Sequence, residues 1–113
     1  MKINKFDILL ANLHPPFGTK PGKVRPVVVV QTDFLNNHHQ STIVCPFTSS
    51  LIEAPSVRLR VKANKESGLT QDSDILIDQI LALDNSRLVK NLGKLDRDQW
   101  SLLLQKLANI ILE

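Results

Sequence analysis

Residues 23–31 read KVRPVVVVQ, and this segment sets the architecture that we expect of the whole chain. Four successive β-branched valines are stiff at χ1 and suit a buried pleated surface, which predicts a central strand covered on both faces. Pro26 has no N–H to give to a ladder, so it belongs at the start of a strand, at an edge or at a bulge. The segment therefore predicts that Arg25 is held at the mouth of a strand, either as a solvated cation or as a ligand for an anion.

The chain has the size of one domain. Its 113 residues, 42% of them apolar, can build a single core and are too few for two. One cysteine excludes an internal disulfide and a Cys-rich zinc cluster, which fits a reducing compartment. Residues 1–7 carry charges where a signal sequence needs an apolar run, and no stretch approaches the ~18 apolar residues of a membrane span. We expect a single cytoplasmic domain over residues 1–113, without a membrane segment.

Positive charge is concentrated in the first half of the chain. The net charge is +3, but residues 1–62 carry eight Lys or Arg against three acids, and residues 63–113 carry six against eight. A polyanionic partner is therefore expected to meet the first half.

Short apolar stretches on either side of the valine segment predict further strands, followed by one helix. The strands are expected at residues 6–12, 42–47, 56–61 and 74–81, and residues 88–95 are expected to form a short strand or an extended link. Asp96 with Gln99 three residues later forms a capping-box pattern, and apolar residues then recur at helical spacing from Trp100 to Ile111. This pattern predicts a mainly β fold with a C-terminal helix (α+β), most simply a small antiparallel barrel.

Three features near the predicted strand ends are candidates for chemistry. Residues 13–24 form a long connection with three prolines and two glycines, and long loops in compact domains are usually functional. Thr48, Ser49 and Ser50 follow a strand and form either a plain turn or a set of hydroxyls beside Arg25, if the two strands pair. Asp78 is expected inside a buried strand, where a carboxylate needs a partner.

Other polar residues leave two interpretations open. Arg58 and Arg60 share one face of a predicted strand. Either this face is simply exposed to solvent, or the two arginines bind phosphates. His38 and His39 lie in a polar turn and are expected to be exposed, whereas His14 opens the long loop and either is structural or assists proton transfer. Cys45 is expected to be a small buried apolar residue rather than a nucleophile.

A series of short motifs runs in a fixed order along residues 6–112. They are Gly18 in the first loop, Arg25-Pro26 before an apolar strand, Pro46-Phe47-Thr48-Ser49, Gly68-Leu69, Asp78-Gln79-Ile80, Leu83-Asp84, Arg87-Leu88, Gly93-Lys94-Leu95 and the C-terminal helix. Their joint order resembles the MazF/PemK/Kid family of toxin endoribonucleases. Three features depart from the family pattern. The first loop has Thr19, Lys20 and Pro21 where many members carry an acid, and Leu76 stands where the Kid-like branch has an arginine. Leu81 follows Gln79-Ile80 where the common pattern has an arginine.

The resemblance implies a fold, an activity and partners. The fold would be an SH3-like, plasmid-maintenance toxin barrel of five to seven short antiparallel strands that forms a homodimer. The activity would be sequence-specific cleavage of single-stranded RNA without a metal or cofactor, which stops translation and growth. The cognate antitoxin would cover the RNA groove with a disordered, acidic and apolar tail. The catalytic pair would be Arg25 and Thr48. Our own expectation for the RNA contacts is a set of polar, charged and aromatic residues, in which Phe17 either packs on the core or stacks on a base: His14, Phe17, Thr19, Lys20, Lys23, Ser49, Arg58, Asp78 and Gln79.

The chemistry of the catalytic pair can be argued independently of the family. Metal-free RNA cleavage needs the 2′-OH to attack its own phosphate, giving a 2′,3′-cyclic phosphate and a 5′-OH. A guanidinium matches the geometry of phosphate oxygens and stays charged. Arg25 is therefore suited to stabilising the negative charge of the phosphorane. A threonine hydroxyl can both donate and accept a hydrogen bond. Thr48 is therefore suited to orienting the 2′-OH or the scissile phosphate.

Two other function classes stay open. A non-catalytic nucleic-acid-binding barrel would use Arg25, Arg58 and Lys62 only to hold the backbone. A gyrase-directed toxin of the CcdB type would share the fold, but such toxins depend on a Trp-Gly-Ile ending, and this chain ends Ile-Ile-Leu-Glu.

Overall fold

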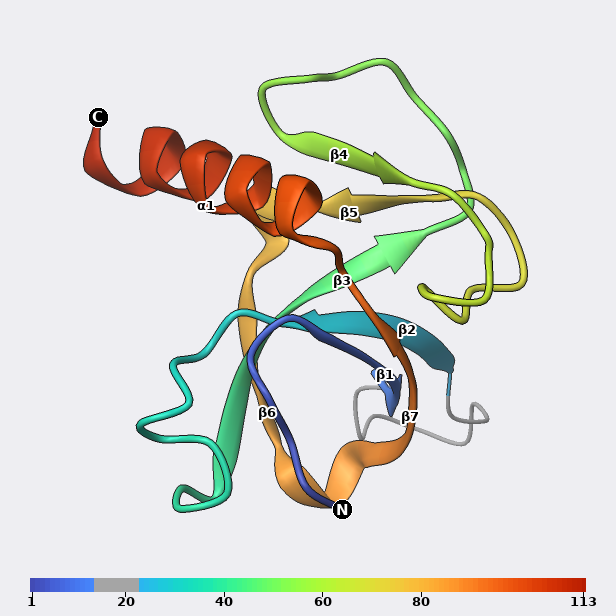
Figure 1. The fold of residues 1–113 in the computed structure, drawn as a ribbon. Helices are drawn as coiled ribbons and strands as arrows, with labels where there is room; N and C mark the ends of the chain where they lie inside the picture. The colour runs from blue at the N-terminus through green and yellow to red at the C-terminus, as the bar shows by residue number, and fades with distance from the viewer. Residues whose placement is uncertain (14–22) are drawn as a thin grey trace.

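The computed structural model describes residues 1–13 and 23–113 of the chain (Figure 1). This part folds into seven strands, two short 3₁₀ helices and one α-helix. In chain order they are β1 (Asp7–Asn12), β2 (Val24–Val29), β3 (Ser41–Thr48), β4 (Arg58–Val61), β5 (Ser73–Leu76), η1 (Ile77–Gln79), β6 (Leu81–Asp84), η2 (Asn85–Arg87), β7 (Leu88–Lys94) and α1 (Arg97–Leu112). The prediction of a mainly β fold with a C-terminal helix is confirmed.

The strands form one antiparallel sheet in the order β4-β5-β3-β2-β1-β7, and β6 pairs with β3 off this path. β3 is shared between two parts of the sheet: its first residues pair with β6, its middle with β2, and its last two with β5. In Figure 1, β4, β5 and α1 lie to one side of β3, and β1, β2, β6 and β7 lie to the other. The end of β3 is therefore the junction between these two parts.

The valine segment lies at the centre of the sheet, as its sequence predicts. β2 pairs with β1 on one edge and with β3 on the other. Val28 packs into one buried apolar cluster, whereas Val27 and Val29 pack into a second cluster on the opposite face. All three side chains are inaccessible to solvent. Since burying such a side chain contributes about 1.5–3 kcal/mol, β2 is a rigid base for whatever its first residues carry.

The strand predicted over residues 74–81 is instead two strands with a turn between them. β5 ends at Leu76, η1 covers the next three residues, and β6 starts at Leu81. The turn rotates Ile77 into the core under α1, where it is fully buried, and brings Asp78 to the surface. The prediction of a buried Asp78 is therefore wrong, because the 3₁₀ turn breaks the alternation that a continuous strand would have imposed.

The C-terminal helix begins at its predicted cap. The Asp96 carboxylate accepts from the Gln99 backbone amide at 2.8 Å, and the Gln99 side chain accepts from the Asp96 amide at 2.9 Å. Trp100 stacks on Phe6 with ring centroids 4.9 Å apart. The apolar spacing of α1 runs to Ile111, but the buried face of the helix ends earlier. Ile111 is exposed because the end of the helix extends past the sheet (Figure 1). Within residues 1–13 and 23–113, no helix has the length and apolar character needed to cross a membrane.

Candidate active site

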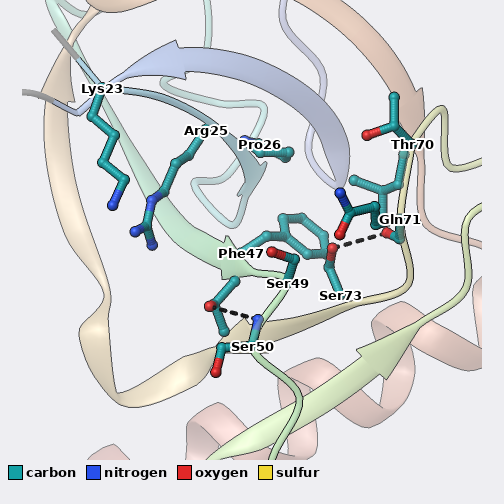
Figure 2. Close-up of a pocket in the computed structure, with 11 residues that line it drawn as sticks. Lys23, Arg25, Pro26, Phe47, Ser49, Ser50, Thr70, Gln71 and Ser73 are labelled. Carbon is teal, nitrogen blue, oxygen red and sulfur yellow. Dashed lines mark hydrogen bonds between the residues drawn. The ribbon is translucent and has the colours of Figure 1, made fainter. Parts of the chain in front are cut away.

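A cavity of about 400 Å³ opens where β2 and β3 separate. The described residues that line it come from three segments: Lys23, Arg25 and Pro26; Phe47, Thr48, Ser49 and Ser50; and Leu69, Thr70, Gln71 and Ser73. Figure 2 shows Lys23 and Arg25 extending from one wall, with Thr70 and Gln71 on the opposite side. The cavity thus has a cationic wall facing a polar, uncharged one.

The cavity exists because the ladder between β2 and β3 stops. The last registered pair is Val27 with Pro46, and the next residue of β2, Pro26, also lacks an N–H. Arg25 and Thr48 each lie two residues beyond this last pair, one on each strand, and both line the cavity. The predicted pairing of the two strands is confirmed.

Arg25 is fixed by its backbone while its side chain remains available. It pairs with Ala11 on β1, and the residue is half-buried. Within the part of the chain that the structure describes, neither a hydrogen bond nor an ion pair engages its guanidinium. Lys23 lies exposed two residues earlier, at the rim of the same cavity. Two cations without a described carboxylate partner make this wall attractive to an anion.

Thr48 ends β3 with its hydroxyl oriented by the turn that follows. The Ser50 backbone amide donates to the Thr48 hydroxyl oxygen at 3.2 Å. This bond uses one lone pair of the oxygen and leaves the O–H free to donate. Ser49 and Ser50 lie in the same turn, so three hydroxyls are gathered beside Arg25.

The uncharged wall is a part of the site that sequence patterns did not predict. It consists of Leu69, Thr70, Gln71 and Ser73, which approach the cavity because β5 pairs with the end of β3. Gly68 before it has φ +69°, and an added Cβ would lie 1.8 Å from the Leu92 carbonyl oxygen. Only glycine satisfies both constraints, so this turn packs directly on β7. No local pattern in residues 69–73 indicates a site, and only the strand pairing reveals it.

Arg58 lies outside the cavity lining and is engaged elsewhere. Its Nη1 donates to Asp74 Oδ2 at 3.2 Å and to the Ser50 carbonyl at 2.8 Å. Arg60 also pairs with Asp74, through Nε at 3.0 Å. Burial alone would raise the pKa of the Asp74 carboxyl, but hydrogen bonds from Arg60, the Ile52 amide and Arg58 outweigh it and hold this pKa below its usual value. The two arginines thus act first as partners of a buried acid.

The remaining predicted residues are distributed as follows. Asp78 and Gln79 are exposed on η1 and do not line the cavity. His14, Phe17, Thr19 and Lys20 fall outside the described residues. His38 and His39 are exposed, as predicted. Cys45 is buried in the core, and desolvation raises the pKa of its thiol to about 12, which confirms a packing role.

The described cavity lining offers hydrogen-bond donors and positive charge. Across residues 1–13 and 23–113, no group of three His, Cys, Asp or Glu side chains is arranged to hold a metal ion. A guanidinium, an ammonium group and several hydroxyls around one space match the oxygens of a phosphate group.

Fold and cavity together define a class: a small mainly β protein that presents cations and hydroxyls to an anion where two strands separate. A family model described as "PemK-like, MazF-like toxin of type II toxin-antitoxin system" matches residues 4–111. The chain therefore belongs to the MazF/PemK-like toxin family, as its motif order suggested.

Named relatives agree with this assignment. Over 97 residues the chain is 34% identical to the endoribonuclease EndoA of Bacillus subtilis, covering 85% of this chain and 83% of that protein. Over 91 residues it is 37% identical to the endoribonuclease MazF of Staphylococcus epidermidis, covering 80% of this chain and 75% of that protein. A MazE–MazF crystal structure from Deinococcus radiodurans matches with a TM-score of 0.83 at 22% identity, over 98% of this chain and 96% of that one, and supports the fold.

Proposed function

We propose that this chain is the toxin of a type II toxin–antitoxin pair and cleaves single-stranded RNA at short sequences without a metal. The family assignment and the names of the two relatives support RNA cleavage as the activity. Cleavage of cellular RNA in the cytoplasm would stop translation and growth.

The proposed reaction is an internal transfer within the RNA. The 2′-OH attacks the neighbouring phosphorus, the bond from phosphorus to the 5′ oxygen breaks, and the products carry a 2′,3′-cyclic phosphate and a 5′-OH. One proton leaves the 2′-OH and one joins the departing oxygen. Arg25 stabilises the charge that builds on the phosphorane oxygens, because its planar fork matches them and never loses its charge. Thr48 orients the attacking group or the scissile phosphate through its free O–H.

The observation that carries this proposal is that Arg25 and Thr48 line the same cavity. One residue is held by a central strand, the other by the turn after β3, and both line the 400 Å³ cavity. Preorganised donors are effective in catalysis because they need not reorganise when charge develops.

The cationic wall also supports the proposed partners. Lys23 and Arg25 would attract the RNA backbone. Ser49 lines the same cavity and could contact that backbone. An acidic and apolar tail of the cognate antitoxin would compete for this cavity by charge complementarity. One of the solved structures that share this fold is a MazE–MazF complex from Deinococcus radiodurans. A homodimer would join two copies of the basic first half of the chain in one RNA groove.

The test is incubation of purified protein with a long single-stranded RNA in excess EDTA, beside Arg25→Ala, with mapping of the cut ends. We expect cuts at a short recurrent sequence, 2′,3′-cyclic phosphate and 5′-OH ends, and loss of cutting in the variant. Products with 3′-OH and 5′-phosphate ends would refute the mechanism. Intact RNA that nevertheless binds would favour the non-catalytic nucleic-acid-binding class.

A further inference from the structure

We infer that Asp74 is a positioning residue for the proposed RNA cleavage, because it holds the turn that carries Thr48 and Ser49 against the cavity. The inference rests on the proposed function, and it assigns a role to an ion-pair cluster that lies behind the cavity wall. Asp74 does not line the cavity; it acts through Arg58, Arg60 and one backbone amide.

The strand register brings Asp74 next to Thr48. Asp74 on β5 is the registered partner of Thr48 on β3 and of Arg60 on β4. Registered residues of an antiparallel sheet point to the same face, so these three side chains form one row. The neighbouring row, Phe47, Ile75 and Leu59, is apolar and buried in the core. Asp74 is thus held in place by the core on the opposite face of the same three strands.

The turn after β3 is fastened by side chains rather than by strand pairing. The Ile52 amide donates to Asp74 Oδ2 at 3.1 Å, and the Ser50 carbonyl accepts from Arg58, which itself pairs with the same oxygen of Asp74. Arg60 binds Asp74 through Nε and reaches Glu53 at 3.0 Å. Lys106 of α1 donates to the Pro55 carbonyl further along. One carboxylate therefore links two points of the turn to the sheet.

These bonds matter for the site because Thr48 depends on Ser50. The Ser50 amide orients the Thr48 hydroxyl, and the Ser50 carbonyl is fixed by Arg58. The two atoms belong to one residue, so a turn that is released from Asp74 and Arg58 also releases the hydroxyl of Thr48. Arg25 would stay in place, since β2 is held by β1 and β3.

An ionised carboxylate is required for this arrangement. Asp74 is 1% exposed and accepts from Arg58, Arg60 and the Ile52 amide, using both of its oxygens. An asparagine of the same shape would accept on one oxygen only and would present an N–H₂ to one of these donors. Asp74→Asn is therefore a nearly isosteric way to loosen the turn.

The experiment compares Asp74→Asn with Asp96→Ala, which removes a helix cap that does not line the cavity and serves as a control of lowered stability. For each we would measure the single-turnover cleavage rate, the affinity for an uncleavable 2′-deoxy RNA, and hydrogen exchange at the Ser50 and Ile52 amides. For Asp74→Asn we expect a rate loss of about tenfold to a hundredfold, the scale of a misplacement near 1 Å, with affinity changed less than about threefold. Amide exchange at both positions should rise. Asp96→Ala should leave all three readouts at wild-type values.

The outcomes separate the two proposals. An active wild type with an unchanged Asp74→Asn rate would overturn the positioning role and leave the proposed function intact. Equal losses of rate and affinity would also overturn it, because Asp74 would then support RNA binding. A wild type that cuts no RNA would overturn both proposals together. If Asp74→Asn does not fold, Arg58→Gln tests the same turn, with rate loss and faster Ser50 exchange expected and no change in either as the contrary result.

Discussion

Arg25 and Thr48, which both line the cavity, are held in place by different interactions. Arg25 is carried by β2, whose backbone is paired on both edges and whose valines are buried on both faces. Thr48 is the last residue of β3, and the turn beyond it is held by a buried carboxylate and two arginines. The position of Arg25 is determined by packing of apolar residues, whereas that of Thr48 depends on polar and charged side chains. The site therefore combines a rigid part with a part that depends on charge.

This difference separates residues that stabilise the fold from residues that carry the proposed chemistry. Within the residues that the structure describes, the Arg25 side chain makes no hydrogen bond or ion pair. Its loss should therefore lower activity but have little effect on stability. Asp74 makes four described side-chain hydrogen bonds, counting two from Arg60, and its loss should cost both. The following predictions test that separation.

Arg25→Ala should give the largest effect, on activity alone. Removing a preorganised charge-stabilising donor typically lowers the rate about 10²–10³-fold. The free energy of unfolding should stay within about 0.5 kcal/mol of wild type, since no described contact of the guanidinium is lost. RNA cleavage rates and urea unfolding measure the two effects. Arg97→Ala on α1 is the control that removes the same charge at an exposed position, and a similar rate loss there would mean that only net charge matters.

Asp74→Ala should give the largest loss of stability among the site residues. Breaking a fully buried ion pair costs about 3–5 kcal/mol; we expect about 2–3 kcal/mol here, because Arg60 stays 40% exposed and can be hydrated. Urea unfolding at neutral pH checks the value. A loss below about 0.5 kcal/mol would show that the ion pairs do not hold this half of the site.

Thr48→Val should lower the cleavage rate without a comparable loss of stability. A hydrogen bond to a charged group contributes about 1.5–3 kcal/mol, so a loss of roughly tenfold to 150-fold is expected, and Thr48→Ser should retain most of the activity. Thr32 offers a matched control, because its hydroxyl oxygen also accepts from the amide two residues on, at the same 3.2 Å. Loss of activity in Thr32→Val would point to a general effect of disrupting such turns.

The smallest effect concerns the pH dependence of two buried acids with opposite pKa shifts. Burial raises the pKa of Asp7 above 3.8, despite the hydrogen bond from the Asn4 amide, whereas Asp74 titrates below 3.8. Ionised Asp74 therefore stabilises the fold above pH 3.8, and this contribution is lost as the pH falls through its lowered pKa. Ionised Asp7 destabilises the fold, and that cost develops as the pH rises from 3.8 through its raised pKa.

Unfolding of Asp7→Asn and Asp74→Asn by urea at pH 3 and pH 7 measures this contrast. Asp7→Asn should gain stability relative to wild type at pH 7 and lose the advantage near pH 3. Asp74→Asn should be destabilised at pH 7, with a smaller deficit at pH 3. The same pH trend in both variants would contradict the opposite roles of the two acids.

The features built by apolar packing or by local hydrogen bonds could be predicted from sequence, and those built by polar contacts between distant segments could not. The valines of β2, the capping box of α1 and the burial of Cys45 follow from side-chain shape and local hydrogen bonding. Asp74 and Asp78 look alike in the sequence, as single acids at the two ends of one apolar stretch. Which of them is buried depends on the 3₁₀ turn that contains Asp78, and that turn is selected by packing of Ile77 under α1.

The candidate site divides in the same way. Arg25 and Thr48 could be predicted because both adjoin strands with clear patterns, and pairing of those strands brings them together. Thr70 and Gln71 could not, since they reach the cavity only through the register of β5. The role of Arg58 as a partner of Asp74 depends on the same register and is not visible in the alternation of its own strand.

The central claim is that the RNA's own 2′-OH is the nucleophile in the cavity between Arg25 and Thr48. The most direct measurement uses a short RNA that contains one mapped cut site and a matched RNA with a single 2′-deoxy nucleotide on the 5′ side of the scissile phosphate. We predict that the modified RNA binds with the same affinity and is not cut at that position. Cleavage of the modified RNA at an undiminished rate would contradict it.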